Sequence, residues 1–258
     1  MTITYDPNHP NYLNEADLRE ELTRVYDLCH GCRLCFKYCT SFPTLFSYVD
    51  AHDDQDAGRL TPAQQDQVVD ECFQCKLCYI NCPYIPGLHE WELDFPRLML
   101  RADATRQANG QVPLRKRMTT TMMGHTDALG KVATTFSPIA NAVMGAEPGS
   151  LVRKVVEKTS GVSSQRLLPP FAKSRFSTWF KKHVSPVMTK KQGKVALFPT
   201  CLVEYQEPGI GKDLINVYEK NNVECSLAEG ASCCGAPYLH SGDVEQFKKV
   251  GVKNVEAL

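Results

Sequence analysis

The sequence predicts an α+β protein in three parts: a helical, cysteine-rich N-terminal domain, a basic and partly helical connector, and a C-terminal α/β domain. Three observations predict this division. Two cysteine runs of identical spacing lie among segments of helical periodicity in the first hundred residues. The next segment is strongly basic, and after residue 193 a strand, a helix and a second strand follow in order. We therefore expect domains at residues 1–100, 101–193 and 194–258.

The two cysteine runs are "CHGCRLCFKYC" (Cys29 to Cys39) and "CFQCKLCYINC" (Cys72 to Cys82), the second followed by Pro83. Each cysteine of the first run recurs 43 positions later in the second, so the runs form an internal repeat. A disulfide framework fits poorly, because 258 residues with 43% hydrophobic content supply enough apolar material for a core. The polar, acidic N-terminus lacks the pattern of a secretory signal. We expect a reduced, cytoplasmic compartment, where such spacings indicate metal or redox chemistry.

The spacing Cys-x2-Cys-x2-Cys-x3-Cys indicates iron–sulfur clusters rather than zinc. A structural zinc site prefers two separated Cys-x2-Cys pairs. In two-cluster ferredoxins with this run, the fourth cysteine ligates the other cluster. The sequence therefore predicts two [4Fe-4S] clusters with crossed ligands. The ligands of cluster 1 are Cys29, Cys32, Cys35 and Cys82, and those of cluster 2 are Cys72, Cys75, Cys78 and Cys39.

A basic residue lies at the same place in each run, Arg33 in the first and Lys76 in the second. A cation beside an anionic cluster stabilises its reduced form, because net charge tunes the cluster potential. We therefore expect these two side chains to lie around the clusters. The alternative is that both are simply solvated.

Helices are expected on either side of the cysteine runs. Leu18, Leu22 and Val25 share one helical face just before Cys29. Before the second run, Thr61-Pro62 has the N-cap and first-turn chemistry of a helix that contains Val68 and Val69. This part of the chain resembles the helical ferredoxin domain of succinate dehydrogenase iron–sulfur subunits and heterodisulfide reductases.

The connector carries most of the positive charge, with 16 basic and 4 acidic residues in 101–193, against 7 basic and 16 acidic residues in 1–100. Apolar residues from Leu129 to Met144 follow helical spacing, with Pro138 as a break. This stretch is too short to span a bilayer. It could lie on an anionic membrane surface, or pack on the protein's own core or on a partner subunit. No nucleic-acid-binding module accompanies the basic residues, so we expect no nucleic acid.

The C-terminal domain reads as β-α-β, with a buried strand in "KVALFPT", a helix in "PGIGKDLINVYEKNN" and a second strand in "VECSL". Ile210, Leu214 and Val217 share one side of that helix. A further helix is expected to begin near residues 241–243. Cys201, Cys233 and Cys234 lie at the ends of strands, where ligands bind in open α/β folds. Cys225 alternates with Val223 and Leu227, which predicts an inert core cysteine.

The full pattern of doubled cysteine run, basic connector, strand-ending Cys201 and Cys233-Cys234-Gly235 resembles the iron–sulfur subunits of the anaerobic glycerol-3-phosphate dehydrogenase, glycolate oxidase and heterodisulfide reductase family. "TDALGKVATTFSPIANAV" and "VVEKTSGV" in the connector add to this resemblance. In that family the cysteine-rich domain also has a distal Cys-x2-Cys, and in heterodisulfide reductases it binds a non-cubane [4Fe-4S] cluster. The resemblance therefore makes Cys201, Cys233 and Cys234 a candidate third metal site. Because the distal pair is missing, the cysteine-rich domain is expected to be incomplete, as a shortened product or with the rest beyond this sequence.

These features predict an oxidoreductase subunit that transfers electrons through two [4Fe-4S] clusters. The electron donor would be a flavoprotein dehydrogenase partner that holds the substrate-oxidising site, and the acceptor a quinone or a thiol/disulfide. We expect the protein in the cytoplasm, in peripheral contact with the inner face of the cell membrane. His30, His89 and His240 are expected near the sites but not as ligands. The rival prediction is a noncatalytic, zinc-stabilised interaction module that grips a partner through the basic connector.

Overall fold

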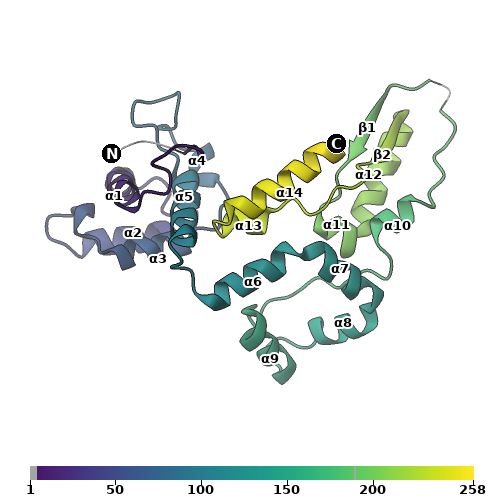
Figure 1. Cartoon of the computed structure of the whole chain (residues 1–258), viewed down its shortest axis with the longest axis horizontal. Coiled ribbons are helices and arrows are strands. Elements are labelled where there is room, and N and C mark those ends of the chain that lie inside the picture. Colours follow the sequence, from purple (N-terminus) through teal and green to yellow (C-terminus); the bar gives the residue numbers. More distant parts are fainter. Residues whose placement is uncertain (1–4, 189) are drawn as a thin grey trace. The chain divides into compact units, whose positions relative to one another are not determined.

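The computed structural model describes residues 5–188 and 190–258 and consists mainly of helices, with one two-stranded parallel sheet (Figure 1). The predicted α+β class is confirmed. The chain forms two compact units. The first unit contains the described residues up to Pro113 together with Tyr238–Val244, and the second unit contains Leu114–Pro237 together with Glu245–Leu258.

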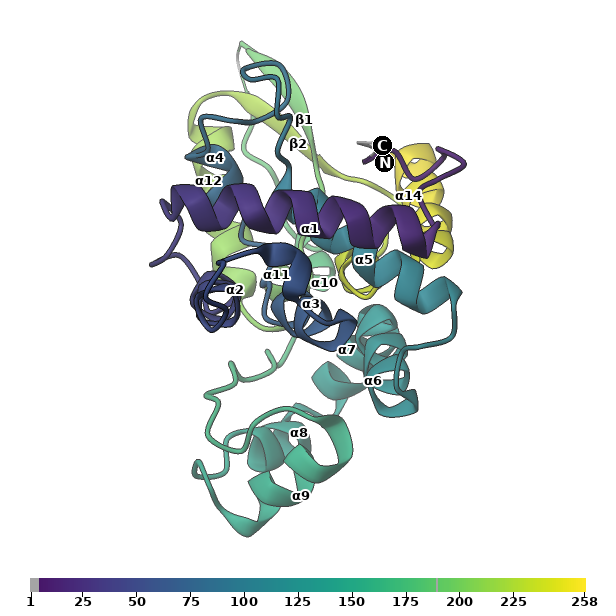
Figure 2. The same ribbon diagram turned by 90° about the vertical axis from the view of Figure 1, so that its left-hand side faces the viewer.

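The first unit is built from short helices around the two cysteine runs, and Figure 2 shows α1 lying across α5 with α2 and α3 beside it. The starts of α1 and α3 are both capped, and the capped start at Thr61-Pro62 is the one that the sequence predicted. Asn14 accepts a hydrogen bond from the backbone N–H of Asp17, and Thr61 forms a reciprocal capping box with Gln64. The elements are α1 (Glu15–Cys32), α2 (Ser41–Asp50), the 3-10 turn η1 (Ala57–Arg59), α3 (Pro62–Asp70), α4 (Leu77–Ile80) and α5 (Phe95–Ala108).

The core of the first unit lies between α1, α2, α3 and α5. The predicted apolar face of α1 is confirmed, because Leu22 and Val25 are 0% exposed and Leu18 is 1% exposed. The other main core side chains are Phe42, Leu45, Phe46, Val49, Val68, Val69, Phe95, Leu98 and Met99. The thiols of Cys29, Cys35, Cys39, Cys72, Cys78 and Cys82 pack against this core. The core therefore fixes one side of both cysteine runs.

A buried arginine ties the N-terminal segment to α5. The Arg101 side chain is 0% exposed, and its guanidinium donates hydrogen bonds to the backbone oxygens of Asn11 and Tyr12 and pairs with Asp17 at 2.8 Å. Buried charges are tolerated when they are paired and hydrogen-bonded, and the Nε and Nη2 atoms of Arg101 meet this requirement, whereas its Nη1 atom has no hydrogen-bond partner among the described residues. The arginine joins chain segments about ninety residues apart.

The second unit begins with the connector, where the apolar stripe forms two helices, α7 (Thr126–Thr135) and α8 (Ser137–Met144). The predicted break is confirmed. It lies at Phe136, and Pro138 takes a first-turn position of α8, where its missing N–H costs nothing. The remaining helices of the unit are α6 (Leu114–Gly124), α9 (Leu151–Ser160), α10 (Phe176–Phe180), α11 (Cys201–Tyr205), α12 (Pro208–Lys220), α13 (Ala236–His240, shared with the first unit) and α14 (Val244–Ala257).

The predicted β-α-β unit is present: β1 (Gly193–Leu197) pairs in parallel with β2 (Val223–Leu227), and α12 lies between them in sequence. The expectation of a buried first strand is wrong, because every residue of β1 is half-buried or exposed. The side of α12 formed by Ile210, Leu214 and Val217 is also exposed. The helix instead turns Gly211 and Ile215 inward, since Gly211 lies directly under the Phe176 ring.

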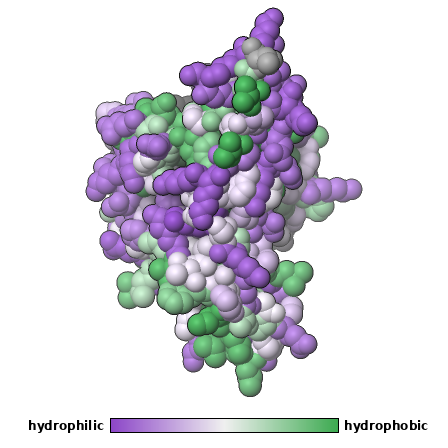
Figure 3. Space-filling view, turned by 90° about the vertical axis from the view of Figure 1, so that its right-hand side faces the viewer, coloured by the Kyte–Doolittle hydropathy of each residue, from purple (hydrophilic) through white to green (hydrophobic). Residues whose placement is uncertain are grey.

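Much apolar surface of the second unit is exposed. Figure 3 shows apolar side chains gathered at the lower end of the view, where Figure 1 places α8 and α9. The large exposed side chains of α7 to α9 are Leu129, Val132, Phe136, Ile139, Val143, Leu151, Val152 and Val155. Among the described residues, no helix combines the length and apolar character that a membrane crossing requires.

Candidate functional site: two groups of cysteines

The first cysteine run begins inside a helix, and this helix ends within the run at a residue with left-handed backbone conformation. Cys29 and Cys32 lie in the last turn of α1, and Arg33 ends the helix with φ 55° while its N–H bonds to the Cys29 carbonyl oxygen. The chain turns sharply at this residue, so Cys35 and Cys39 lie beyond the end of the helix. Few non-glycine residues adopt this conformation. The turn therefore folds the Cys-x2-Cys-x2-Cys segment back on itself.

The second run repeats this turn at the corresponding position. Lys76, which is 43 positions after Arg33, has φ 60° and ψ 8°, close to the φ 55° and ψ 7° of Arg33. Lys76 precedes the short helix α4, which carries Cys78, and Cys82 follows the end of that helix. The sequence repeat is thus also a repeat of backbone conformation.

Thiols of both runs influence one another, which shows that the structure brings the runs together. The pKa of Cys35 is raised to about 11, first by burial and then by the Cys82 thiol. Burial, followed by Cys35 and then Cys82, raises the pKa of Cys29 well above its ordinary value. The fourth cysteine of the second run therefore lies among the first three cysteines of the first run.

Cys39 of the first run and thiols of the second run also influence one another. Burial, followed by the Cys39 and Cys75 thiols, raises the pKa of Cys72 to about 11, although a hydrogen bond from the Gln74 backbone lowers it in part. The pKa of Cys39 is also raised by burial, with Cys75 as the thiol that contributes most. Cys78 is half-buried, and burial, followed by the Cys35, Cys72 and Cys39 thiols, raises its pKa. Cys35 and Cys78 thus each have neighbours in both of the predicted groups of four ligands.

The residues present fit two iron–sulfur clusters by their chemistry. All eight cysteines are free, and each group contains four thiols, the usual ligand set of a [4Fe-4S] cluster. Six of the eight, Cys29, Cys35, Cys39, Cys72, Cys78 and Cys82, have a raised pKa, because burial and neighbouring thiols destabilise their thiolate forms, a cost that a bound cationic centre removes. In the described part of the chain, no three His, Cys, Asp or Glu side chains converge closely enough to hold a single metal ion.

Arg33 is more than a solvated cation, because it belongs to a polar cluster with His30 and Asp50. Its guanidinium pairs with Asp50 and contacts His30, and it lies over the Phe46 ring at 5.3 Å from the centroid. The His30 Nε2 atom lies 2.9 Å from the Asp50 carboxylate. The charge of Arg33 is thus largely balanced by Asp50. Lys76 is exposed, and its charge lowers the pKa of Asp94, although burial, the larger effect, raises that pKa overall.

The three histidines near the cysteine motifs each have contacts with other residues. His30 is buried in the pair just described. His89 packs edge-on against Tyr84 and Trp91 and accepts a hydrogen bond from the Trp91 backbone. Burial, followed by the nearby Lys76, lowers the pKa of His240. No pattern in the sequence indicated that Asp50 would hold His30 and Arg33 together.

Two of the three predicted cysteines of the second unit meet. The Cys201 thiol donates to the Cys233 sulfur at 3.6 Å, whereas Cys234 is exposed. This contact lowers the pKa of Cys233, which accepts the hydrogen bond, and raises that of Cys201, which donates it. Cys201 opens α11 behind the N-cap Thr200, and Gly235 has φ 81°, the left-handed conformation that favours glycine after the cysteine pair.

Two residues that the sequence analysis did not single out hold the Cys233 backbone. Its N–H donates to the Asp127 Oδ2 atom at 2.7 Å, and its carbonyl oxygen accepts from the Asn254 side chain at 3.0 Å. Asp127 also accepts from the Tyr205 hydroxyl at 2.9 Å. Asp127 belongs to the connector and lies 106 positions before Cys233, so no local pattern could have indicated it.

A cavity of about 930 Å³ in the second unit opens onto this pair, and its walls include Cys201, Cys233 and Cys225. The expectation of a core position for Cys225 is wrong. Its side chain is half-buried, because β2 has only β1 beside it in the sheet and faces the cavity. The charged residues of the wall are Asp127, Lys131, Arg175, Lys181, Glu204, Glu229 and Lys253.

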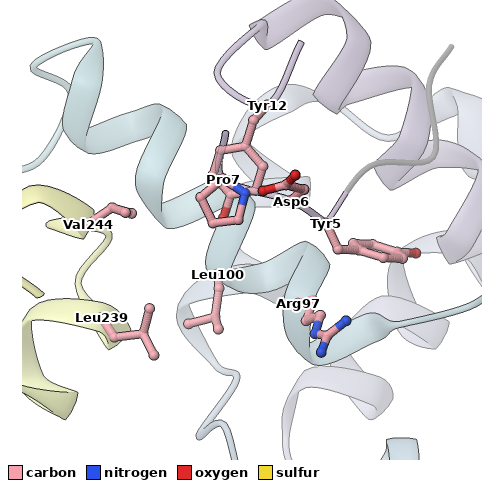
Figure 4. Close-up of a pocket in the computed structure, with 8 residues that line it drawn as sticks. All are labelled: Tyr5, Asp6, Pro7, Tyr12, Arg97, Leu100, Leu239 and Val244. Carbon is pink, nitrogen blue, oxygen red and sulfur yellow. The ribbon is translucent and has the colours of Figure 1, made fainter. Parts of the chain in front are cut away.

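A second hollow, of about 590 Å³, lies in the first unit between the N-terminal segment, α5 and Tyr238–Val244 (Figure 4). Its wall is mostly aromatic and aliphatic, and Asp6 and Arg97 are its charged residues. Among the described residues, neither a cysteine nor a histidine lines this hollow, so we assign it no chemistry.

Comparison with known proteins identifies two domains. Residues 21–84 match the model of a 4Fe-4S dicluster domain, and residues 195–258 match that of a cysteine-rich domain. The chain thus has the dicluster and cysteine-rich domains that the sequence pattern predicts. No solved structure matches it significantly.

The chain is homologous, at modest identity, to bacterial proteins of two kinds. It is 31% identical over 137 residues to one of the subunits of the anaerobic glycerol-3-phosphate dehydrogenase of Escherichia coli (strain K12), a match that covers 53% of this chain and 34% of that protein. It is 39% identical over 62 residues to the lactate utilization protein A of Shouchella clausii, a match that covers 24% of this chain and 26% of that protein. The chain thus matches about a third or less of the length of these relatives.

Proposed function

We propose that this protein is an iron–sulfur electron-transfer subunit of an oxidoreductase, with two [4Fe-4S] clusters in the first unit. The observation that carries the proposal is that thiols of the two cysteine runs influence one another, Cys82 acting on Cys29 and Cys35, and Cys75 on Cys39. Cysteines 29, 32, 35 and 82 would hold cluster 1, and cysteines 72, 75, 78 and 39 would hold cluster 2. A cluster of four irons stands between its ligands, so the four thiols of a group need not converge on one point.

The arrangement of the thiols supports transfer from one cluster to the other. Cys35 and Cys78 each have thiols of both groups as neighbours, which is consistent with two adjacent clusters. When bound, the clusters supply reversible one-electron redox chemistry. The apolar core against which Cys29, Cys35, Cys39, Cys72, Cys78 and Cys82 pack would exclude water from that side of the clusters. Arg33 and Lys76 would set the local charge, although Asp50 offsets that of Arg33.

The partner would be a flavoprotein dehydrogenase that donates electrons, and the acceptor a quinone or a thiol/disulfide. This part of the proposal is supported by the relative whose name identifies it as part of an anaerobic glycerol-3-phosphate dehydrogenase. The features that the first unit presents are thiols around two centres, and these suit electron transfer. The substrate-oxidising site would therefore lie on the partner.

Metal content distinguishes this proposal from a zinc-stabilised interaction module. Anaerobically purified protein should be brown, lose visible absorbance on reduction with dithionite, and contain iron and acid-labile sulfide for two cubane clusters. Colourless protein with stoichiometric zinc would overturn the proposal and favour the module.

Electron paramagnetic resonance of cysteine variants tests the crossing. Cys39→Ser should damage the same signal as Cys72→Ser, and Cys82→Ser the same signal as Cys29→Ser. Cys225→Ser is the matched control and should leave both signals unchanged, because Cys225 lies in the second unit. If Cys39→Ser and Cys29→Ser removed the same signal, the ligands would not be crossed.

We also propose that the connector attaches the protein to the inner face of the cell membrane. Exposed apolar side chains of α9, such as Leu151 and Val155, lie in the same helix as Lys154 and Lys158. An amphipathic helix with basic residues binds anionic lipid through buried apolar area and charge attraction.

The domain limits that the sequence predicts at residues 100 and 193 stay a prediction.

Liposome flotation tests the attachment. Binding should require anionic lipid, weaken as salt rises, and weaken when Lys154 and Lys158 are changed to Gln, because exposed charges are screened over about 10 Å at 0.1 M salt. Neutralising Arg115, Lys116 and Arg117 should have a similar effect. The control is Lys248→Gln with Lys249→Gln, which removes the same charge from α14. Binding that ignores lipid charge and salt would exclude the membrane contact.

A further inference from the structure

Gln74, inside the second cysteine run, is held in a backbone conformation that glutamine rarely adopts. Its φ is 55°, in the left-handed region that few non-glycine residues enter. The matching position of the first run, 43 residues earlier, is Gly31, which lies within α1. The second run thus has a long polar side chain at a strained position where the first run has none. A strained residue beside a site points to a function of its side chain.

The Gln74 side chain donates two hydrogen bonds, and one of them goes to a predicted cluster ligand. Its Nε2 atom lies 3.1 Å from the Pro96 carbonyl oxygen and 3.7 Å from the Cys72 sulfur. The amide nitrogen of glutamine carries two N–H groups, so one can serve each acceptor. Because the Pro96 oxygen can only accept, the nitrogen and not the oxygen of the amide faces Cys72.

The other end of the same amide has no partner. The Oε1 atom of Gln74 is buried and makes no hydrogen bond within the described part of the chain. A buried acceptor that lacks a donor destabilises the fold. An apolar side chain of similar size, such as methionine, would avoid this cost, so packing alone does not require glutamine here. The orphaned oxygen therefore favours a role for the N–H groups on the nitrogen.

We infer that Gln74 raises the reduction potential of the cluster that Cys72 holds, and so makes that cluster the electron acceptor of the two. The inference rests on the proposed function and deepens it, since it gives the pair of clusters a direction. Reduction adds negative charge that spreads onto the ligating sulfurs, and an N–H group that donates to such a sulfur stabilises the reduced form. One electron passes from cluster 1, which is oxidised, to cluster 2, which is reduced, with no bond formed and no proton transferred.

Backbone N–H groups add to the same asymmetry. The Gln74 backbone also donates to the Cys72 sulfur and partly offsets the rise in pKa that burial causes there. Burial likewise raises the pKa of Cys39, while two backbone N–H groups just after it lower that pKa in part. Both sulfurs belong to the predicted ligands of cluster 2. Among the predicted ligands of cluster 1, Cys82 accepts from the Tyr84 backbone N–H at 3.4 Å.

The charged side chains beside the two runs do not cancel this asymmetry. Asp103 raises the pKa of Cys72, though less than burial and the neighbouring thiols do. Arg106 pairs with the Asp103 carboxylate at 2.7 Å and offsets its charge. In the first run Arg33 pairs with Asp50, whereas the matching cation of the second run is exposed. The hydrogen bonds to the Cys72 sulfur therefore remain the main difference.

Redox titration of the purified protein, followed by electron paramagnetic resonance, tests the inference. The signal of cluster 2 is the one that Cys72→Ser removes, an assignment that does not depend on the crossing. Gln74→Met keeps the size of the side chain and removes its donors. It should shift the electron distribution between the clusters about tenfold toward cluster 1, which is about 59 mV for one electron. The potential of the other signal should stay unchanged.

Further variants separate the hydrogen bond from charge and from folding. Gln74→Lys keeps donors and should hold the potential of cluster 2 at or above the wild-type value. Gln74→Glu loses the donors and adds a negative charge, so it should lower that potential more than Gln74→Met does. Gln74→Gly copies the first run, suits the left-handed backbone, and should act as Gln74→Met does. Gln111→Met is the matched control in the same unit, because Gln111 bonds to Glu15, and it should change neither potential.

Three outcomes would decide against the inference. Wild-type potentials in Gln74→Met and Gln74→Gly would show that the hydrogen bond has no effect, even where Gln74→Lys and Gln74→Glu shift the potential by charge. Equal shifts of both signals would indicate a structural change and not the lost contact with Cys72. Wild-type protein without iron and acid-labile sulfide would overturn the proposed function together with the inference, whereas iron-loaded protein with unchanged potentials would overturn the inference alone.

Discussion

The two units of this protein differ in how completely they cover their apolar side chains. The first unit encloses a continuous core in which residues such as Leu22, Phe42 and Leu98 are almost fully buried. In the second unit Phe176 and Ile215 are buried, but Leu214, Val217 and most of the apolar residues of α7 to α9 are exposed. The same helical periodicity therefore corresponds to a closed core in the first unit and to solvent-exposed apolar helix faces in the second.

The difference shows that an amphipathic pattern indicates a helix but does not say what covers its apolar face. In the first unit the neighbouring helices cover the apolar stripe of α1. In the second unit the sheet has two strands, and α12 presents Ile210, Leu214 and Val217 to solvent. Exposed apolar faces of this kind mark surfaces for a partner or a membrane. Each unit has one tryptophan, Trp91 in the first and Trp179 in the second, so their unfolding can be followed separately.

The largest expected effect is the loss of the buried arginine of the first unit. Arg101→Met should destabilise this unit by about 3–5 kcal/mol, because Asp17 and two backbone oxygens lose a buried partner. Urea unfolding followed by Trp91 fluorescence in a Trp179→Phe background measures it. Arg97→Met is the matched control, since the Arg97 side chain is 63% exposed and should matter little. Equal effects of the two variants would contradict a tightly closed first unit.

The next effect compares one leucine in each unit. Leu22→Ala should cost about 2–5 kcal/mol, the range for a cavity in a closed core. Leu214→Ala, at a side chain that is 44% exposed, should cost less than about 1 kcal/mol. The two values come from urea unfolding with Trp91 and Trp179 fluorescence respectively. A similar loss for both would mean that the face of α12 is covered in solution, for example by a second copy.

A smaller effect tests whether the second unit has any tightly packed centre. An added Cβ at Gly211 would lie 2.5 Å from the Phe176 ring, so Gly211→Ala should destabilise the unit by about 1–3 kcal/mol. Gly209→Ala in the same helix meets nothing within 4 Å and should be neutral or stabilising by about 0.5–1 kcal/mol. The measurement is urea unfolding followed by Trp179. If Gly211→Ala were neutral, Phe176 would be free to move.

The smallest effect concerns the exposed charges of the sheet. Lys191, hydrogen-bonded to Glu224 at 2.6 Å, lowers the pKa of that carboxyl group below its ordinary value. A carboxyl group whose pKa is lower in the folded state stabilises the folded protein at pH values above the ordinary pKa of Glu. This stabilisation is lost as the pH falls through the pKa of the folded state. Between pH 6 and pH 4 the urea midpoint of the Trp179 transition should therefore drop slightly more in the wild type than in Glu224→Gln. A larger drop in the variant would reverse the sign of this linkage.

Local features of this protein follow from short stretches of its sequence. The repeated cysteine spacing corresponds to two repeated turns, and the Thr61-Pro62 pair predicted a capped helix that the structure contains. The stripe of Leu18, Leu22 and Val25 predicted a buried helix face. These features depend on contacts within a few residues, where propensity, capping and periodicity act directly.

Which distant residues meet depends instead on tertiary packing. The fold places Asp50 against His30 and Arg33, and Asp127 against the backbone of Cys233. It also leaves β1 half-buried or exposed, although the sequence pattern predicted a buried strand there. The apolar side of α12 is exposed as well. Periodicity shows which side of a helix or strand is apolar, but not which element packs against that side. A single carboxylate such as Asp50 or Asp127 belongs to no sequence pattern that would indicate its partner. Those contacts depend on how the helices pack, which is set by the whole chain and not by any segment of it.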